Sequence, residues 1–533
     1  GGRVLFARGG WWALRLQGVN RHGLLPPSAA RARLPPEPLE GRLYWRAPPH
    51  AGGAELSGQG RLGASSWRVQ LASPVRRIAP VPEGARLVIS ADGPAAPWRV
   101  ALGLPAERAR QAAQDETAQD EAQLQLTMER RADGGWNSAA QLALSGAEAR
   151  LGGVLRGGLV PTRFDGQVAF EGHDWTRLWP TARAAGNRAA GNSAAQFRAR
   201  ARLSYAPAKL AFSHLQLAWD DNRLHGEGVW RWQASRPRLV ANLHFSRLQL
   251  SDNLFAADAA LDWEGLAALN AAVEWSAAEL VWRGWRAHSV RATMRLHDSV
   301  MEFQPAVAAL YGGSWAGAVR LEGGALIPSV HAQGRVRNVD AARLLGRAWQ
   351  PPPLAARLET VFALKSHGRS WRAHLAQLEG GGNLQLEGGR LAGMELAALA
   401  HGAERLQSLD EIAPLLARSL GEGASEFAVW RGRYEWRSGV LTMQDAPLIL
   451  SDGLGEGRLQ LRYDARTNQL DSTLEVRLAP TRPQGKALPP WQMRLSGAPQ
   501  ELALRFVTDG LAEELSARVL RHDEIGELGL PPA

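Results

Sequence analysis

The sequence predicts a mainly β protein. We expect a long, twisted, mostly antiparallel sheet, curled into an elongated groove or open barrel, with a few short amphipathic helices near the C-terminus. Short segments of alternating apolar and polar residues recur roughly every 10–14 residues, a spacing typical of antiparallel all-β proteins. Glycine, at 57 of 533 residues, punctuates these segments, and apolar residues make up 45% of the chain. The chain is therefore long and apolar enough for a large core or several modules.

The N-terminal β region, residues 1–104, contains short strand-like segments bounded by glycine, proline or serine. The candidates are Arg3 to Phe6, Trp12 to Leu16, Gly41 to Trp45, Ser57 to Leu62, Trp67 to Leu71, Arg86 to Ser90 and Trp98 to Leu102. Residues 105–122 are rich in alanine, glutamine and acidic residues. We interpret them as a linker or a short helix that ends this region.

Residues 123–325 form the predicted β-groove repeat region, which begins with the alternating segment Gln123 to Arg130. Three segments share a weak pattern, in which a strand runs into a polar residue and a leucine-bearing turn: Phe170 to Leu178, Phe245 to Leu254 and Val336 to Leu345. Their spacing is irregular, so they predict a loose structural repeat rather than a solenoid.

The next region, residues 326–480, contains the clearest helix, at 394–420. Its leucines recur on one helical face. We expect Gly402 and Pro414 to split this helix in two, and Gly421 and Gly423 to end it. The last region, residues 481–533, predicts strands, a short helix from Leu511 to Leu520 and a tail.

Composition excludes several kinds of site. The chain has no cysteine, so it can form no disulfide framework, iron–sulfur cluster or cysteine-based zinc site. Its net charge is +10, and the arginines are scattered rather than gathered, which argues against a nucleic-acid footprint. No apolar run of about 18 residues could span a bilayer as a helix. Because the chain begins abruptly in a strand-like segment, we expect a targeting or anchoring segment upstream.

No pattern in the sequence marks a catalytic, cofactor-binding or metal-ligating residue. The segment from Gly312 to Gly317 lacks the glycine that a nucleophile elbow needs after its serine, so it predicts a tight turn between strands. Gly380-Gly381-Gly382 and Gly388-Gly389 lack the lysine of a phosphate-binding loop and are interpreted as turn glycines. Asp220-Asp221-Asn222 predicts a hairpin turn, and Asp445 and Asp452 predict solvated loops beside a strand.

The chain has 21 tryptophans, and two interpretations of them remain open. Trp263, Trp275, Trp282 and Trp285 form one group and Trp430 and Trp436 another. They could pack across strands in a core. They could also line an apolar surface, because alternation lets one face of a strand be apolar while the other meets water. In a curved, incompletely closed sheet such a surface would be a groove suited to acyl chains, with arginines at its rim for phosphate head groups.

Three segments resemble the AsmA-like family. Leu310 to Leu321 is similar to a strand–turn–strand signature of that family. Residues 379–478 resemble its C-terminal domain, and Leu215 to Leu254 resembles its middle region. The resemblance covers residues 200–480 and lies in the order of these segments more than in any one of them.

The resemblance implies a β-sheet protein of Gram-negative bacteria, exposed to the periplasm and tethered to the inner membrane by an N-terminal segment. It implies a role in outer-membrane biogenesis, with phospholipid acyl chains bound in an apolar groove and carried between the inner and outer membranes. It implies no catalytic residues, no cofactors and no metal, so we expect a non-enzymatic protein. The helix at 394–420 would cap or plug the groove.

Two alternatives remain. The same scaffold would suit an assembly factor for outer-membrane proteins or a secretion apparatus, acting by strand-edge pairing. A carbohydrate-active enzyme would need two paired carboxylates in a tryptophan-lined cleft, and no spacing in the sequence marks such a pair.

Overall fold

A computed structural model describes the greater part of the chain. The described residues are 3–7, 11–20, 38–47, 52–62, 64–76, 81–94, 121–144, 146–157, 161–173, 196–232, 236–250, 263–282, 284–345, 354–481, 486–499 and 501–527. The chain divides into two compact units, Gly1–Leu254 with Ala271–Trp275, and Phe255–Asn270 with Ser276–Ala533. The predicted strand Trp98 to Leu102, most of the predicted linker at 105–122 and the C-terminal tail lie outside the described residues.

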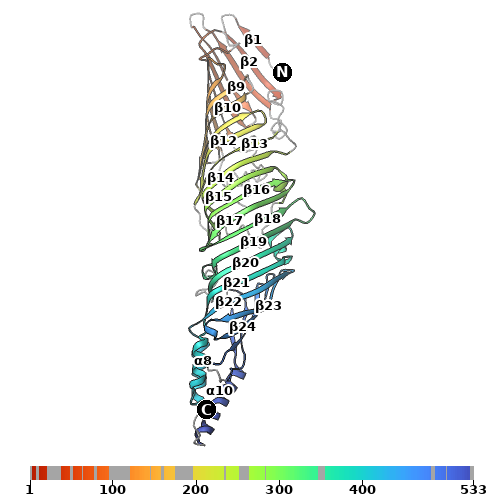
Figure 1. Ribbon diagram of the computed structural model, residues 1–533. Coiled ribbons are helices and arrows are strands. Elements are labelled where there is room, and N and C mark those ends of the chain that lie inside the picture. The colour runs from red at the N-terminus through yellow and green to blue at the C-terminus, as the bar shows by residue number, and fades with distance from the viewer. Residues whose placement is uncertain are drawn as a thin grey trace. The chain divides into compact units, whose positions relative to one another are not determined.

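The first unit is built of antiparallel strands that follow one another in chain order (Figure 1). Each strand pairs with the next along the chain. The strands are β1 (Arg3–Ala7), β2 (Trp11–Asn20), β3 (Pro38–Arg46), β4 (Ala54–Leu62), β5 (Ser65–Ser73), β6 (Arg86–Pro94), β7 (Glu121–Arg130), β8 (Trp136–Leu144), β9 (Ala147–Gly157), β10 (Pro161–Gly172), β11 (Phe197–Ala206), β12 (Lys209–Trp219), β13 (Asn222–Arg231) and β14 (Arg238–Leu250).

The second unit repeats this arrangement, with β16 to β27 each paired antiparallel to the next. Its strands are β16 (Trp285–His297), β17 (Val300–Leu310), β18 (Gly313–Glu322), β19 (Ser329–Asp340), β20 (Leu354–His367), β21 (Glu379–Ala392), β22 (Ala424–Arg437), β23 (Val440–Leu450), β24 (Gly455–Asp464), β25 (Gln469–Leu478), β26 (Trp491–Gly497) and β27 (Ala503–Val507). Strand β15 (Asn270–Trp282) has residues in both units.

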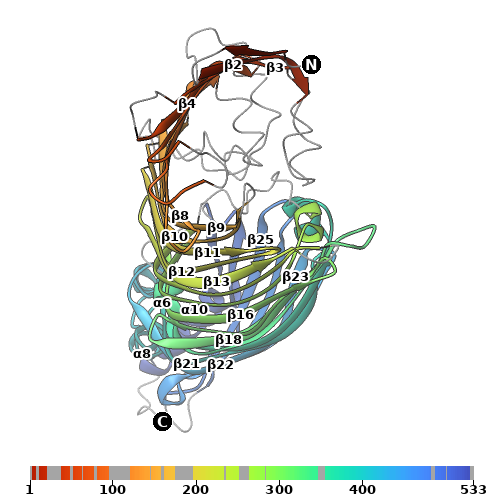
Figure 2. The same cartoon turned by 90° about the horizontal axis from the view of Figure 1, so that it is seen from above.

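The predicted fold class is confirmed: the protein is mainly β and mostly antiparallel, and its sheet is not a closed barrel. Seen from above, strands β16 to β25 of the second unit curve, so their sheet has a concave and a convex face (Figure 2). Curvature of this kind follows from strand twist and from bulges, which shift the register in several of these ladders.

Few helices interrupt the described strands, and all of them are short except the last. They are η2 (Glu264–Ala267), α6 (Ala341–Leu345), α7 (Trp371–Ala376), α8 (Leu396–Arg405), η3 (Leu409–Glu411), α9 (Ile412–Ser419), η4 (Ser451–Gly453) and α10 (Asp509–Glu527). Helix α6 follows the predicted polar residue of the third repeat segment, where the Asp340 carboxylate accepts a hydrogen bond from the Arg343 amide at 3.1 Å. The predicted C-terminal helix corresponds to the longer α10.

The helix predicted over 394–420 is split, but not at the residues that we expected. The break lies at residues 406–408, whereas Gly402 is inside α8 and Pro414 is inside α9. Leu415 packs against Gly402, where an added Cβ would stand 3.2 Å from Leu415 Cδ2, so this glycine serves helix–helix contact. Pro414 falls in the first turn of α9, where an amide hydrogen has no helical partner in any case.

Two other expectations were wrong. Gly380, Gly381, Gly382, Gly388 and Gly389 lie within strand β21 rather than in turns. At Gly380, Gly381, Gly382 and Gly389 the lack of a side chain lets neighbouring strands or rings approach the backbone, which a turn pattern in the sequence does not reveal. Gly388 instead has open space around it and a φ of 55°.

Asp445 likewise lies within strand β23, at a register irregularity, and not in a loop. Its φ of 48° is tolerated by aspartate better than by most residues. The two predicted hairpin turns are confirmed. Tyr311 and Gly312 join β17 to β18 with φ of 43° and 83°, and Asp220, with φ of 48°, lies in the turn from β12 to β13.

Candidate functional site

The register of the second unit separates the side chains into two chemically different faces. One row of paired positions crosses ten consecutive strands, β16 to β25, and every residue in it is apolar. Its members are Met294, Phe303, Val319, Ala332, Leu364, Gly380, Trp436, Leu441, Tyr463 and Leu470, counting the tyrosine ring as apolar. A second row on the same side begins Ala292, Ala306, Gly317, Gly334, Phe362, Gly382, Tyr434 and Met443. We call this side the apolar face.

The opposite side of the same strands is polar. Moving one residue along each strand from the first row gives Arg295, Glu302, Arg320, His331, Lys365 and Glu379. Successive residues of a strand point to opposite faces, so this charged row lies behind the apolar one. We call this side the polar face.

The first unit has the same two faces. One apolar row crosses nine consecutive strands, β3 to β11: Leu43, Gly58, Val69, Ile89, Leu126, Ala140, Leu151, Val168 and Ala201. The adjacent row on the other side includes Arg42, Gln59, Arg68, Gln125, Gln141, Arg150 and Arg200. In each unit, therefore, the apolar face is unbroken from strand to strand.

The apolar face lies on the inner side of the curved strands. Along β18 to β20 its side chains, such as Trp315, Phe362 and Leu364, are half-buried, while Ala316, Val361 and Ala363 on the polar face are exposed. Glycines on the apolar face are crowded: a Cβ at Gly334 would stand 2.9 Å from Phe362 Cζ. Side chains converge on the concave side of a curved sheet, so they are less exposed and more crowded there. The apolar face has both properties.

The two interpretations of the tryptophans both hold in part. Trp430 and Trp436 of β22 lie on the apolar face, paired with Leu386 and Gly380. Trp430 meets Phe427 of the same strand edge to face, with ring centroids 6.3 Å apart, so it packs along β22 while lining this face. In the other group, Trp282 and Trp285 meet edge to face at 5.8 Å.

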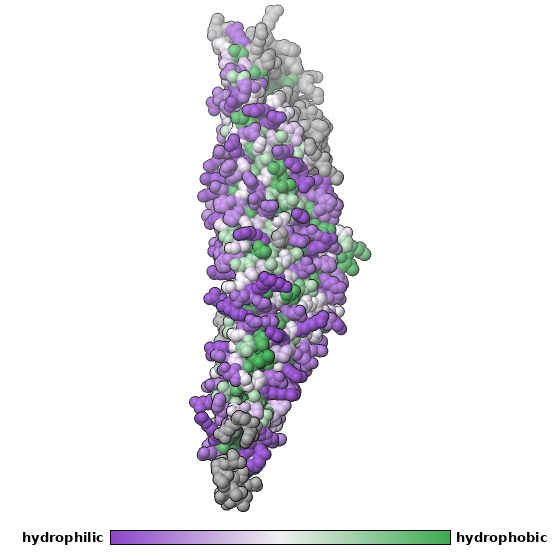
Figure 3. Space-filling model, viewed as in Figure 1, coloured by the Kyte–Doolittle hydropathy of each residue, from purple (hydrophilic) through white to green (hydrophobic). Residues whose placement is uncertain are grey.

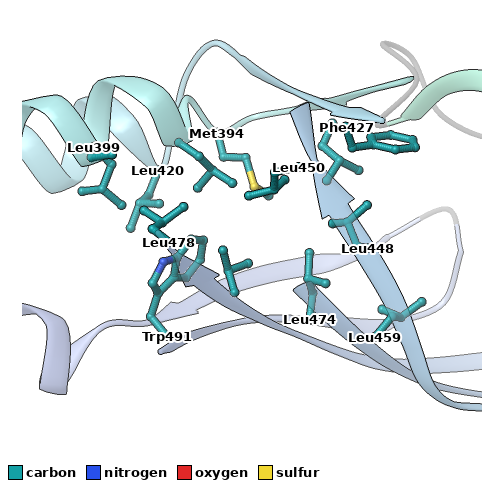
Figure 4. Close-up of a cluster of buried hydrophobic side chains, with 14 of the residues drawn as sticks. Met394, Leu399, Leu420, Phe427, Leu448, Leu450, Leu459, Leu474, Leu478 and Trp491 are labelled. Atoms are coloured by element: carbon teal, nitrogen blue, oxygen red, sulfur yellow. The ribbon is translucent and has the colours of Figure 1, made fainter. Parts of the chain in front are cut away.

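At its C-terminal end the apolar face is covered. Met394, Leu399 and Leu420 of the segment that carries α8 and α9 pack with Leu448 and Trp491 of the strands (Figure 4). Leu511 and Leu515 of α10 belong to the same cluster. These side chains are at most 5% exposed. This helical cap thus packs against side chains of strands β21 to β26.

Hydrogen bonds clasp the base of this helical cap. The Ser425 hydroxyl donates to the Met394 carbonyl at 2.8 Å and accepts from the Leu396 amide at 2.9 Å. The Glu395 amide donates to the Ser419 carbonyl at 2.7 Å. Glu395 provides no side-chain cap for α8, so Ser425 satisfies an amide that would otherwise be unpaired at the helix start. No pattern in the sequence indicates this role of a serine about 30 residues away.

The polar face carries ion pairs along individual strands. Arg150 pairs with Glu148 at 2.7 Å, Arg320 with Glu322 at 2.7 Å and Arg477 with Glu475 at 2.9 Å. Each pair joins positions two apart on one strand, which face the same way. Figure 3 shows hydrophilic side chains along the flanks of the surface in view, with apolar patches between them.

Depressions of about 580 to 980 Å³ in the second unit are lined mainly by residues of the polar face and of β21. The apolar rows contribute Val319, Ala332 and Leu364 to one of these depressions, but the apolar face as a whole is not one of them. It is an extended surface, whereas the depressions are local hollows between long side chains.

No constellation for catalysis stands out among the described residues. Ser314, the serine of the elbow-like segment, is an exposed strand residue paired with Arg337. His374 is buried with its Nδ1 2.9 Å from Ser366 Oγ, and burial lowers its pKa. No three histidine, aspartate or glutamate side chains gather as metal ligands in the described part of the chain. Within that part, no helix has both the length and the apolar character needed to cross a membrane.

Comparison with known proteins gives one match. The model of the AsmA family matches residues 263–446, which run from η2 into β23. No curated protein matches the chain, and no solved structure does. The match is narrower than the resemblance read over residues 200–480, and it includes the strand–turn–strand segment around Gly312 and the cap formed by α8 and α9. Residues 263–446 are therefore similar to the AsmA family.

Proposed function

We propose that this chain is a non-enzymatic periplasmic protein of outer-membrane biogenesis whose apolar face binds or conducts phospholipid between the inner and outer membranes. The observation that carries the proposal is the unbroken apolar face, which runs over ten consecutive strands in the second unit and nine in the first. The AsmA family segment supports the link to outer-membrane biogenesis.

An acyl chain is the ligand that this surface fits best. Burying apolar surface stabilises a complex by about 0.8 kcal/mol for each methylene removed from water. A surface that is apolar in every strand lets an acyl chain shift from one strand to the next without crossing a polar barrier. Contiguous exposed apolar surfaces are uncommon on soluble monomers and mark sites for ligands, membranes or partners.

Each lipid would keep its head group in water. The apolar face is open over β18 to β20 and buried under the cap at β23 to β26. We infer that acyl chains lie along the open part and do not pass beneath the cap in the conformation described. Scattered arginines at strand ends would meet the phosphates through charge-assisted hydrogen bonds.

Lipid extraction from the purified full chain, followed by mass spectrometry, tests the proposal. We expect phospholipid to co-purify and Leu364→Glu to reduce its amount several-fold, because Leu364 lies in the apolar row. Ala363→Glu is the matched control, since Ala363 is its neighbour on the polar face and is exposed. Absence of lipid from the unmodified chain, or equal loss in both variants, would overturn the proposal.

The open edge of β27 favours a second candidate, an assembly factor that pairs strand to strand with outer-membrane proteins. Among the described strands β27 pairs only with β26, and Leu504 on it is 48% exposed. An unpaired edge can accept a strand from another chain. Photocrosslinking from Leu504 to a barrel protein in cells would favour this candidate over lipid transfer.

A further inference from the structure

A depression on the polar face of the second unit collects four arginines. Its volume is about 720 Å³, and Arg335 and Arg337 of β19 line it together with Arg431 and Arg433 of β22. All four side chains are exposed. The depression lies across β19 to β23, on the side opposite the apolar face, so a ligand here would not compete with an acyl chain.

These arginines lack the carboxylate partners that some arginines of the polar face have. Arg150, Arg320 and Arg477 each have a carboxylate partner on their own strand. Within the described residues, Arg335, Arg337, Arg431 and Arg433 make no ion pair and no side-chain hydrogen bond. Five N–H donors on each guanidinium are thus available, in a geometry that matches phosphate oxygens two at a time.

Irregular backbone flanks the depression on both sides. The register of β19 with β20 shifts between Val336 and Val339, around Arg337. The register of β22 with β23 shifts between Trp430 and Tyr434, the segment that holds Arg431 and Arg433. Bulges re-aim side chains and are often found beside functional sites. Here one register shift lies beside Arg337, and the other lies between the strand that holds Arg431 and Arg433 and its neighbour β23.

Two residues at these irregularities have left-handed backbone. Asn338 next to Arg337 has φ of 53°, and Asp445 in the lining has φ of 48°. Asparagine and aspartate adopt this conformation more readily than most other residues. Their conformation accompanies the two register shifts beside the arginines.

The spacing of the arginines sets the size of the ligand. Strands β20 and β21 lie between β19 and β22, so the two arginine pairs stand roughly 14 Å apart at the backbone, three interstrand steps. Arg335 and Arg337, two residues apart on one strand, are separated by about 7 Å. The long arginine side chains can reach inward from both ends of the depression. They would hold a ligand whose two anionic groups are joined by a small linking part.

The other residues that line the depression indicate the chemistry of the part of the ligand that lies between its two anionic groups. Between the arginine pairs lie the side chains of Asn383 and Gln385, with Gln444 and two carboxylates, Glu359 and Asp445, also in the lining. Carboxylates would repel a simple polyanion, but they accept hydrogen bonds from hydroxyl groups, and the amides can donate or accept. Four guanidinium groups against two carboxylates leave a positive excess for the phosphates. We propose that this depression binds a phosphorylated polyol or saccharide with two phosphate groups.

Calorimetric titration of the full chain with fructose 1,6-bisphosphate tests this proposal, with fructose and pyrophosphate as comparison ligands. We expect saturable binding of the bisphosphate that weakens as salt is raised, and at least tenfold weaker binding of fructose and of pyrophosphate. The double variant Arg335→Gln with Arg433→Gln should lose at least tenfold in affinity. Arg466→Gln with Arg477→Gln is the matched control, because it removes the same charge from exposed residues that already have carboxylate partners at 2.6 and 2.9 Å.

Equal binding in the two double variants would overturn the proposal, as would no saturable binding or binding of pyrophosphate as tight as that of the bisphosphate. Circular dichroism of both variants confirms that they remain folded. Sedimentation with vesicles of phosphatidylinositol 4,5-bisphosphate in phosphatidylcholine then shows whether the phosphorylated ligand is a lipid head group or a soluble molecule. Binding to these vesicles assigns a lipid head group, and binding only to the soluble bisphosphate assigns a free metabolite.

Discussion

The ring of Phe164 lies over Gly153 of the neighbouring strand, so that a Cβ added to Gly153 would stand 2.9 Å from Phe164 Cε2. Phe164 is 7% exposed and belongs to the apolar face. Gly152, the residue before Gly153, points to the polar face and has open space where its Cβ would be. Two adjacent glycines therefore have opposite environments, and the difference follows from the two faces of the sheet.

This pair gives the first prediction. Gly153→Ala should lower the free energy of unfolding by about 1–3 kcal/mol, because the added methyl displaces the Phe164 ring and meets backbone of β10. Gly152→Ala should leave it unchanged within about 0.5 kcal/mol. Urea denaturation followed by tryptophan fluorescence measures both. Equal effects of the two substitutions would contradict the assignment of the faces.

The hydrogen bonds of Ser425 at the base of the cap give a second prediction. Ser425→Ala removes the hydroxyl that bonds Met394 and Leu396 and leaves a buried amide and a buried carbonyl without partners. We expect a local loss of about 1–3 kcal/mol. Hydrogen exchange should quicken in α8 and α9 and stay unchanged in β16 to β18. Unchanged protection of α8 would show that the cap does not depend on this serine.

The cluster beneath the cap gives a third. Leu399 is fully buried there, so Leu399→Ala should cost about 2–5 kcal/mol through lost burial and a residual cavity. Leu409, which is 48% exposed in the same helical segment, provides the control. Leu409→Ala should change the unfolding midpoint far less. A larger effect at Leu409 than at Leu399 would be inconsistent with the packing in Figure 4.

The buried histidine gives a fourth prediction, which concerns how stability depends on pH. His374 lies between Trp263 and Trp371, with ring centroids 5.6 and 6.0 Å away. Burial lowers the pKa of His374 below its ordinary value of 6.5, because removal from water disfavours the imidazolium. The unfolded chain therefore binds the proton more readily, and stability should fall as pH drops through that ordinary value.

His374→Gln should make the second unit less sensitive to acid between about pH 8 and about pH 5, since the titrating group is gone. His367→Gln, at an exposed neighbour, should keep the sensitivity of the unmodified chain. Unfolding midpoints at several pH values make the comparison. An undiminished slope in His374→Gln would assign the acid sensitivity to other groups.

Local alternation predicted the strands well, because a strand with one apolar side shows its period of two directly in the sequence. Gln123 to Arg130 is an example, and it is now seen as β7 (Glu121–Arg130). Alternation also implies two faces on each strand. It does not state the register, and only the register shows that Leu364, Trp436 and Tyr463 fall in one row.

Glycines and bulges were harder to interpret. The residue type alone does not distinguish a glycine in a strand from a glycine in a turn. Gly382 is required in its strand because Tyr434 and the backbone of β20 approach it closely. The arginine-lined depression was not predicted either. Arg337 and Arg433 are about a hundred residues apart and are brought to one surface only by the intervening pairing of β20 and β21.

The most direct test of the central claim is photocrosslinking to phospholipid in cells, with benzoylphenylalanine placed alternately on the two faces. In the second unit it would replace Leu364 or its neighbour Ala363, and in the first unit Leu203 or its neighbour Arg202. The account predicts lipid adducts, identified by mass spectrometry, at Leu364 and Leu203 and few at Ala363 and Arg202. Adducts of equal yield on both faces, or on the polar face alone, would contradict it.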